Sequence, residues 1–223
     1  MIQVVARPLV VFDFDHTLFR GDSGAMLIRW LISRHWQRTL VAALATPFLA
    51  PWFLWTESRR AALSAYLWIA TVGWRRRDFD HHVANFVQAR GAKLQSLLID
   101  TGLVRLREHL ANGDKVVIAT GAPPELIGRI LAVVAHQHVS VVGTVMGPRL
   151  RAIIAVHHCH AAEKVRMLRA AGHVAPIAVA YTDSIADLPL LRAADRPVAI
   201  NPKPKALRAF QEALGTKLVE ERW

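Results

Sequence analysis

Short apolar runs that end in polar residues recur along the chain. Those of strand length lie at residues 9–13, 115–120, 139–145, 177–183 and 198–201. Helix-like stretches lie between them, at 103–110 before Asn112-Gly113 and at 161–171 before Gly172, and Pro123-Pro124 opens another. Strands that alternate with helices predict an α/β fold, a Rossmann-like parallel sheet with helices on both faces.

Residues from about 22 to 95 depart from this pattern. They show no strand alternation, and their apolar stretches have helical lengths. We therefore expect two parts. Residues 1–21 and 96–223 form the α/β core domain, and residues 22–95 form an all-helical cap inserted after the first strand.

The charge of the chain is concentrated in this predicted cap. The net charge is +11 over 223 residues. Between residues 24 and 77 there are eight arginines and one acid, Glu57, a net of +7. Six of the seven tryptophans lie in the same interval. This composition indicates a task for the cap that the rest of the chain does not share.

Composition also narrows the class of protein and its compartment. With 53% hydrophobic and 20% charged residues, the chain has the composition of a folded globular protein. A single cysteine, Cys159, excludes an internal disulfide and fits a reducing compartment. The first fifteen residues lack the pattern of a secretory signal. We expect a cytoplasmic protein.

Three polar motifs follow predicted strands, at the edge where doubly wound sheets bind ligands. They are 13–17 (DFDHT), 120–122 (TGA) and 183–187 (DSIAD), and Lys164 lies on the helix between the last two. Carboxylates that converge in one pocket need a compensating cation, and oxygen ligands select a hard ion such as Mg²⁺. The hydroxyl and N–H groups of the second motif suit an anionic oxygen. The sequence therefore predicts a site for a phosphate group and a divalent cation.

In order and spacing, these motifs resemble the four motifs of the haloacid dehalogenase superfamily, over essentially the whole chain. The resemblance implies that Asp13 attacks phosphorus and forms an aspartyl-phosphate. Asp15 would protonate the leaving oxygen and then activate water. Since Asp15 is present, phosphomonoester hydrolysis is favoured over carbon–halogen cleavage.

The same resemblance assigns the remaining motif residues. Thr120 and the N–H of Gly121 would hold phosphoryl oxygens, and Lys164 would neutralise the developing charge. The Mg²⁺ ligands would be Asp13, the backbone carbonyl of Asp15, and Asp183. Beside these ligands, Asp187 and Thr17 would support the site.

Within the superfamily the chain resembles the phosphoserine phosphatase subgroup, which carries an acid facing the substrate at the Asp22 position. Three residues depart from that subgroup, namely His16, Thr182 and Ala186, and the last replaces an asparagine. The chain is more similar to the phosphatidylglycerophosphatase C family, in Asp22, Tyr66-Leu67-Trp68, residues 120–123 and residues 181–191. This implies a lipid phosphate as substrate. A small soluble phosphorylated metabolite remains the alternative.

The apolar segment 39–74 of the cap allows two interpretations. Residues 39–56 carry no charge, and a second apolar stretch follows Arg59-Arg60. Flanking arginines and tryptophans suit an anionic membrane surface. The two apolar stretches could form a helical hairpin that dips into one leaflet, at the inner face of the cytoplasmic membrane. The alternative is a soluble cap with a tryptophan core. Pro47 and Pro51 would break a simple helix and argue against a full span.

Two further clusters have less specific patterns. Residues 157–160 (HHCH) lack the spacing of a zinc site and are expected in a loop near the mouth of the active site. Arg75, Arg76 and Arg77 could bind phosphates, but no nucleic-acid module accompanies them, so no nucleic-acid partner is predicted. A membrane or anionic substrate fits these arginines better. The sequence does not indicate an oligomeric state.

Overall fold

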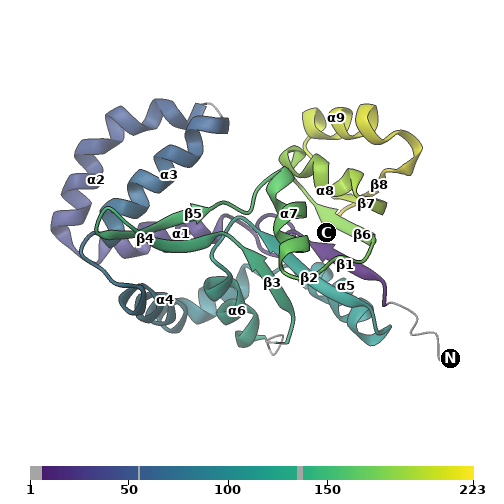
Figure 1. The fold of residues 1–223 in the computed structure, drawn as a ribbon, viewed down its shortest axis with the longest axis horizontal. Coiled ribbons are helices and arrows are strands. Elements are labelled where there is room, and N and C mark those ends of the chain that lie inside the picture. The colour runs from purple at the N-terminus through teal and green to yellow at the C-terminus, as the bar shows by residue number, and fades with distance from the viewer. Residues whose placement is uncertain (1–6, 55, 135–137) are drawn as a thin grey trace.

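The structure is a computed structural model that describes residues 7–54, 56–134 and 138–223. Trp55 and the six N-terminal residues, on which the sequence interpretation drew, lie outside these ranges. A parallel sheet with flanking helices forms one part of the molecule, and a helical segment forms the other (Figure 1). This is the α/β architecture that the sequence predicts.

The main sheet has six strands in the order β3-β2-β1-β6-β7-β8, and every neighbouring pair is parallel. The strands are β1 (Leu9–Phe12), β2 (Lys115–Thr120), β3 (Ser140–Gly143), β6 (Ile177–Thr182), β7 (Ala194–Ile200) and β8 (Val219–Glu221). All four residues of the central strand β1 are buried. Because a parallel strand inside a sheet is covered on both faces, an uninterrupted apolar run suits this position.

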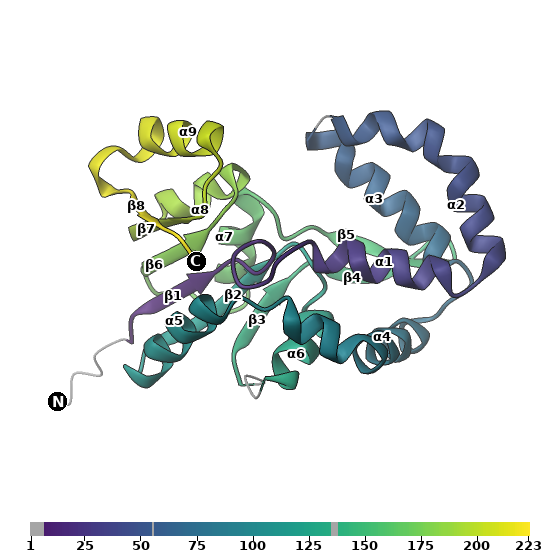
Figure 2. The same cartoon turned by 180° about the vertical axis from the view of Figure 1, so that it is seen from behind.

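Helices cover both faces of the sheet. They are α5 (Asp100–Ala111), α6 (Pro124–Val133), α7 (Ala162–Ala170), α8 (Leu188–Arg192) and α9 (Pro204–Leu214), with 3₁₀ turns η2 (Ile185–Asp187) and η3 (Gly215–Lys217). Val10 and Phe12 pack with α5 and α6, whereas Leu9 and Val11 pack with α7, α8 and α9. Figures 1 and 2, taken from opposite sides, show α7 and α5 in front of the sheet in turn. The period of two along β1 thus builds two separate cores.

The helical segment contains α1 (Ser23–Ser33), α2 (Trp36–Leu49), η1 (Ala50–Leu54), α3 (Thr56–Thr71) and α4 (Arg76–Ser96). Pro47 lies inside α2, two residues before the helix ends, and Pro51 lies in the 3₁₀ turn that follows. The prolines therefore end the helix without preventing it. In the described part of the chain, no helix is both long and apolar enough to cross a bilayer.

A β-hairpin, which the sequence interpretation did not anticipate, packs against this helical segment. It pairs β4 (Val145–Arg149) with β5 (Ala152–His157), antiparallel, and the turn contains Leu150 and Arg151 at positive φ. The buried hydroxyl of Thr71 on α3 donates to the carbonyl of Ile153 at 2.8 Å and accepts its N–H at 3.1 Å. The single strand predicted over 139–145 is therefore two strands, β3 and the start of β4.

The arginine run 75–77 is only partly available to a ligand. Arg76 is half-buried and forms ion pairs with Asp80 and with Glu125 of α6. It also donates to the carbonyl of Met146 at 2.8 Å. Arg76 thus joins α4 to the core and to the hairpin, while its neighbours Arg75 and Arg77 are exposed.

Candidate active site

The carboxyl ends of β1, β2 and β6 meet at one edge of the sheet, beneath the helical segment. A cavity of about 520 Å³ opens there. Its lining includes most of the polar residues that the sequence singles out, namely Asp13, Asp15, Asp22, Gly121, Lys164, Asp183 and Asp187. Residues from four separate parts of the chain are therefore brought to one pocket.

Lys164 connects the first and third motifs inside this pocket. Its Nζ donates to Asp13 Oδ1 at 2.5 Å and to Asp187 Oδ2 at 2.6 Å. All three side chains are buried. Lys164 enters from the first turn of α7, whose start is set by Ala161 at positive φ. The hydroxyl of Thr182 also donates to Asp187 Oδ2, at 2.9 Å.

The pocket is lined by more acidic side chains than lysines. Burial raises the pKa of Asp13, Lys164 opposes that shift, and Asp187 adds to it. Burial also raises the pKa of Asp183. Although burial by itself would lower the pKa of Lys164, Asp13 and Asp187 raise it. One ammonium group is thus shared among several acids, and the site favours a further positive charge.

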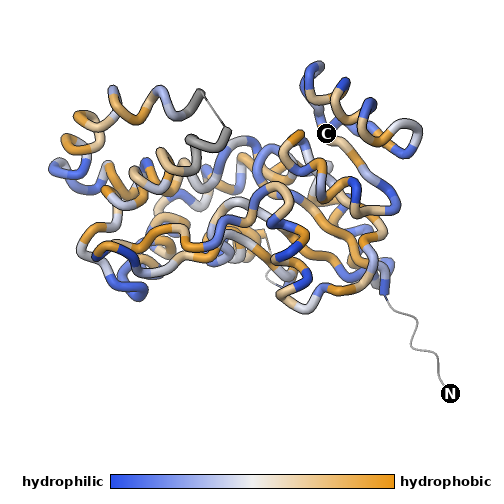
Figure 3. Tube along the Cα trace, turned by 45° about the horizontal axis from the view of Figure 1, so that its top comes forward, coloured by the Kyte–Doolittle hydropathy of each residue, from blue (hydrophilic) through white to orange (hydrophobic). Residues whose placement is uncertain are grey.

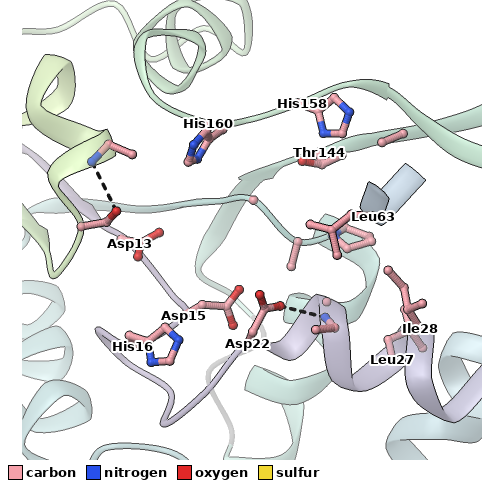
Figure 4. A pocket seen from close by; sticks show the side chains of 18 of the residues that line it. Asp13, Asp15, His16, Asp22, Leu27, Ile28, Leu63, Thr144, His158 and His160 are labelled. Carbon is pink, nitrogen blue, oxygen red and sulfur yellow. Dashed lines mark hydrogen bonds between the residues drawn. The ribbon is translucent and has the colours of Figure 1, made fainter. Parts of the chain in front are cut away.

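Asp15 faces the same cavity from the loop after β1. Its Oδ1 accepts the backbone N–H of Ser23 at 2.8 Å. Burial first, and then the nearby Asp22, raise the pKa of Asp15 to about 7. Figure 4 shows Asp15 and Asp22 side by side on one wall of the pocket. Asp22 also accepts the N–H of Ala25 at 2.7 Å and so caps α1.

Thr17 holds the first and third motifs together. Its hydroxyl lies 3.5 Å from Asp13 Oδ2 and accepts the backbone N–H of Asp183 at 3.2 Å. The Thr17 side chain is fully buried, behind the cavity wall. This arrangement suits the supporting role expected of it.

In the second motif, Thr120 and Gly121 were both expected to bind phosphate, but they occupy different positions relative to the cavity. Gly121 and Ala122 line the cavity, whereas Thr120 is fully buried and is absent from the lining. The hydroxyl of Thr120 accepts the N–H of Ala122 at 3.1 Å. In this arrangement Thr120 shapes the turn that presents Gly121 to the pocket.

The donor set fits a hard divalent cation. No three His, Cys, Asp or Glu side chains in the described ranges form a ready metal cluster. The expected set, however, needs only two side chains, Asp13 and Asp183, beside the carbonyl of Asp15. Mg²⁺ usually keeps several waters and takes one or two carboxylates. Asp187 Oδ1 is buried without a hydrogen-bond partner, which leaves an acceptor for such a hydrated ion.

Of the residues 157–160 expected in a loop near the mouth, His158 and His160 line the cavity, whereas His157 is the last residue of strand β5 and Cys159 is buried. His158 and His160 follow β5, and Figure 4 shows them on the wall opposite Asp15 and Asp22. His160 lies toward Asp13, and His158 lies over Thr144. Both histidines come directly after strand β5, a position typical of site residues. The sequence does not reveal this position, because β5 was not predicted.

The end of the cavity away from Asp13 is apolar. Its lining comes from α1, α3, α4 and the β4–β5 hairpin, and comprises Leu27, Ile28, Leu63, Leu67, Phe79, Met146 and Ala155. The pocket therefore joins a polar, acidic end to an apolar end built largely by the helical segment. The sequence alone does not place these residues in the site, because their orientation depends on how the helical segment packs.

Residues 10–192 match the model of the haloacid dehalogenase-like hydrolase family. Since this match covers well over half of the chain, the protein belongs to that family. No match was found among curated proteins.

Solved structures share the fold at low sequence identity. A protein of unknown function from Bordetella pertussis is 23% identical, with a TM-score of 0.71, over 96% of this chain and 98% of that one. A phosphoserine phosphohydrolase-like protein from Francisella tularensis is 15% identical, with a TM-score of 0.60, over 92% of each chain. A phosphoserine phosphatase with a phospho-aspartyl intermediate analogue is 12% identical, with a TM-score of 0.52, over 97% and 94%.

Proposed function

We propose that the protein is a Mg²⁺-dependent phosphatase that hydrolyses phosphomonoesters through a phosphoryl group carried on Asp13. The observation that carries this proposal is the buried contact between Lys164 Nζ and Asp13 Oδ1, at 2.5 Å, in a pocket that Asp15 also lines. A cation held against a carboxylate nucleophile can neutralise the charge of an incoming phosphoryl group.

In the first half of the reaction, a carboxylate oxygen of Asp13 attacks phosphorus while the bond to the leaving oxygen breaks. Asp15 donates its proton to that oxygen, and a pKa of about 7 leaves the group able to do so near neutral pH. In the second half, Asp15 takes a proton from water as the water attacks phosphorus. The bond to Asp13 then breaks, and phosphate leaves.

Two groups of residues assist these steps. Gly121 lines the cavity, where its N–H would bind a phosphoryl oxygen, and Thr120 braces that turn. Asp13, the carbonyl of Asp15, and Asp183 would hold Mg²⁺, with Asp187 beside them. When bound, Mg²⁺ would offset the negative charge of the phosphoryl group and these carboxylates.

We infer further that the substrate is a lipid phosphate, and phosphatidylglycerophosphate is the compound that the sequence resemblance suggests. The apolar lining from Leu27, Leu63 and Met146 supports this, because it would face the leaving group of an ester bound at Asp13. Ala186, where phosphoserine phosphatases carry asparagine, argues against phosphoserine. Such a substrate would be met at the inner face of the cytoplasmic membrane.

The alternative is a small soluble metabolite. Asp22 lines the pocket and could face a polar leaving group, as the phosphoserine phosphatase-like fold allows. One assay separates the two, with lipid phosphates in mixed micelles and a panel of water-soluble phosphate esters, each with Mg²⁺ or with chelator. A higher kcat/KM for the lipid esters supports the lipid substrate, and a clear preference for one soluble ester contradicts it. No turnover of any ester with Mg²⁺ would overturn the phosphatase itself.

A further inference from the structure

A stripe of exposed apolar side chains runs along α2. Its members recur at every fourth residue and are Trp36, Leu40, Leu44 and Phe48, with Trp52 of η1 continuing the interval. Their exposed fractions are 72%, 51%, 65%, 77% and 43%. Because residues four apart are neighbours on a helix surface, these side chains form a continuous stripe that winds slowly round α2, by about 40° at each step. We call this surface the α2 stripe.

The fold makes little use of α2. Ala42 is its only buried residue. Figure 1 places the helix at the outer edge of the molecule, and in Figure 3 its tube is largely orange over the middle of the helix. Soluble proteins rarely expose a contiguous apolar surface of this kind unless something binds there.

The charge around the α2 stripe favours an anionic partner. No acidic residue occurs between Asp22 and Glu57, an interval that contains Arg29, Arg34 and Arg38. Arg29 and Arg34 are exposed. Arg38 donates to the carbonyl of Val72 at 3.2 Å, and its guanidinium lies 4.5 Å from the centre of the Trp74 ring. Arg34, just before α2, and Arg38, in its first turn, therefore place basic groups at the start of the helix.

The distribution of residue types within the α2 stripe points to a lipid surface. Trp36 and Trp52 stand at its two ends, with aliphatic residues and Phe48 between them. Tryptophan favours the headgroup zone, and basic residues favour anionic lipids. Helices with an apolar face and basic surroundings lie in the plane of the membrane interface. A fourteen-residue helix, as α2 is, suits this position and is too short to span a bilayer.

We propose that the α2 stripe docks the protein on an anionic bilayer, with α2 lying in the interface. The proposal deepens the lipid-phosphate assignment and in part rests on it. α2 packs on α1 and α3, and these helices carry Leu27, Ile28, Leu63 and Leu67 of the cavity wall. Docking through α2 therefore sets the apolar end of the cavity one helix away from the lipid.

The test is co-sedimentation with vesicles of phosphatidylcholine, alone or mixed with phosphatidylglycerol. The unchanged protein should sediment with the mixed vesicles, and high salt should weaken the binding. The triple variant Leu40→Ser, Leu44→Ser, Phe48→Ser should bind these vesicles at least about a hundredfold more weakly, because each change removes a large apolar group from the contact.

A matched control uses exposed apolar residues of the core domain. Val104→Ser, Leu110→Ser and Val174→Ser change side chains that are 45%, 40% and 77% exposed. This variant should bind vesicles like the unchanged protein. Thermal unfolding of both triple variants, together with turnover of p-nitrophenyl phosphate, shows that each is folded.

Failure of the unchanged protein to bind the mixed vesicles would overturn the proposal, and two further outcomes would do so as well. The first is vesicle binding that the α2 triple variant retains. The second is a dimer in sedimentation velocity that this variant dissociates, with no vesicle binding, since the α2 stripe would then be covered by a second copy. The catalytic assignment is tested separately. Vesicle binding by a protein that hydrolyses no ester supports docking through the α2 stripe and contradicts phosphatase activity. Hydrolysis without vesicle binding supports phosphatase activity and contradicts docking.

Discussion

Asp15 is hydrogen-bonded to the first residue of the helical segment, since its carboxylate accepts the backbone N–H of Ser23 at 2.8 Å. Asp22, which stands just before α1, also raises the pKa of Asp15, after the larger effect of burial. The group proposed to move protons is therefore held, and its pKa raised, where the loop after β1 meets the helical segment. Changes at this junction should alter catalysis even though Asp13 lies elsewhere in the pocket.

Asp15→Asn should affect esters according to their leaving groups. An alkyl phosphate needs a proton on its leaving oxygen, so kcat/KM should fall by about 10²–10⁴-fold. p-Nitrophenyl phosphate, whose leaving group is stable as an anion, should lose less in its first step. The measurement compares kcat/KM and any burst of p-nitrophenol for the two esters. Equal losses with no burst would argue against Asp15 as the acid.

Lys164→Met should destabilise the protein as well as inactivate it. The change leaves the buried Asp13 and Asp187 without their shared partner, and breaking a buried ion pair costs about 3–5 kcal/mol. Urea unfolding in chelator measures the loss. Lys205→Met, at an exposed lysine on α9, should change the free energy of unfolding very little. Equal stability of the two variants would refute the buried network.

Without metal, stability should show the raised pKa of Asp15. A carboxyl whose pKa rises from 3.8 to about 7 on folding binds its proton more tightly in the folded state. Its contribution is therefore present at low pH and is lost as the pH rises from about 4 to 7. As the pH rises over this range in chelator, the unchanged protein should lose free energy of unfolding relative to Asp15→Asn. A constant difference would contradict the raised pKa.

Leu63→Asn should discriminate among substrates by their apolar length. Leu63 lines the cavity at its apolar end. The variant should lower kcat/KM for a long-chain lipid phosphate by about tenfold, and by less for a short-chain analogue. Val174→Asn, at an exposed residue outside the pocket lining, serves as the control. A loss independent of chain length would remove the support that this wall lends to a lipid substrate.

The sequence predicts β1, β2 and β6 well because each of these strands is an apolar run followed by a polar motif, whereas β7 begins at Ala194, four residues before the strand predicted over 198–201. β2 covers the expected residues 115–120, and β1 and β6 end one residue before Asp13 and Asp183. Gly113 and Gly172 have positive φ, as helix ends at these places require. The local signal is strong here because strand and motif lie next to each other in the chain.

Other parts of the fold depend on tertiary contacts that no local pattern reveals. β4 contains Gly147 and Pro148, which are unfavourable in strands, and the hairpin is held in part by Thr71 of α3. β8 is three residues long and polar, and it forms by pairing with β7. His158 and His160 reach the cavity only because this hairpin directs them there. The apolar end of the site could not be predicted either, because it too depends on tertiary contacts.

The most direct test of the account asks whether Asp13 carries the phosphoryl group. The reaction with Mg²⁺ and p-nitrophenyl phosphate is quenched in acid within the first turnover, and the protein is digested for mass spectrometry. We predict one added phosphoryl group on the peptide that contains Asp13, absent in Asp13→Asn. Continued turnover with no phosphorylated peptide, or with the group on another residue, would contradict it.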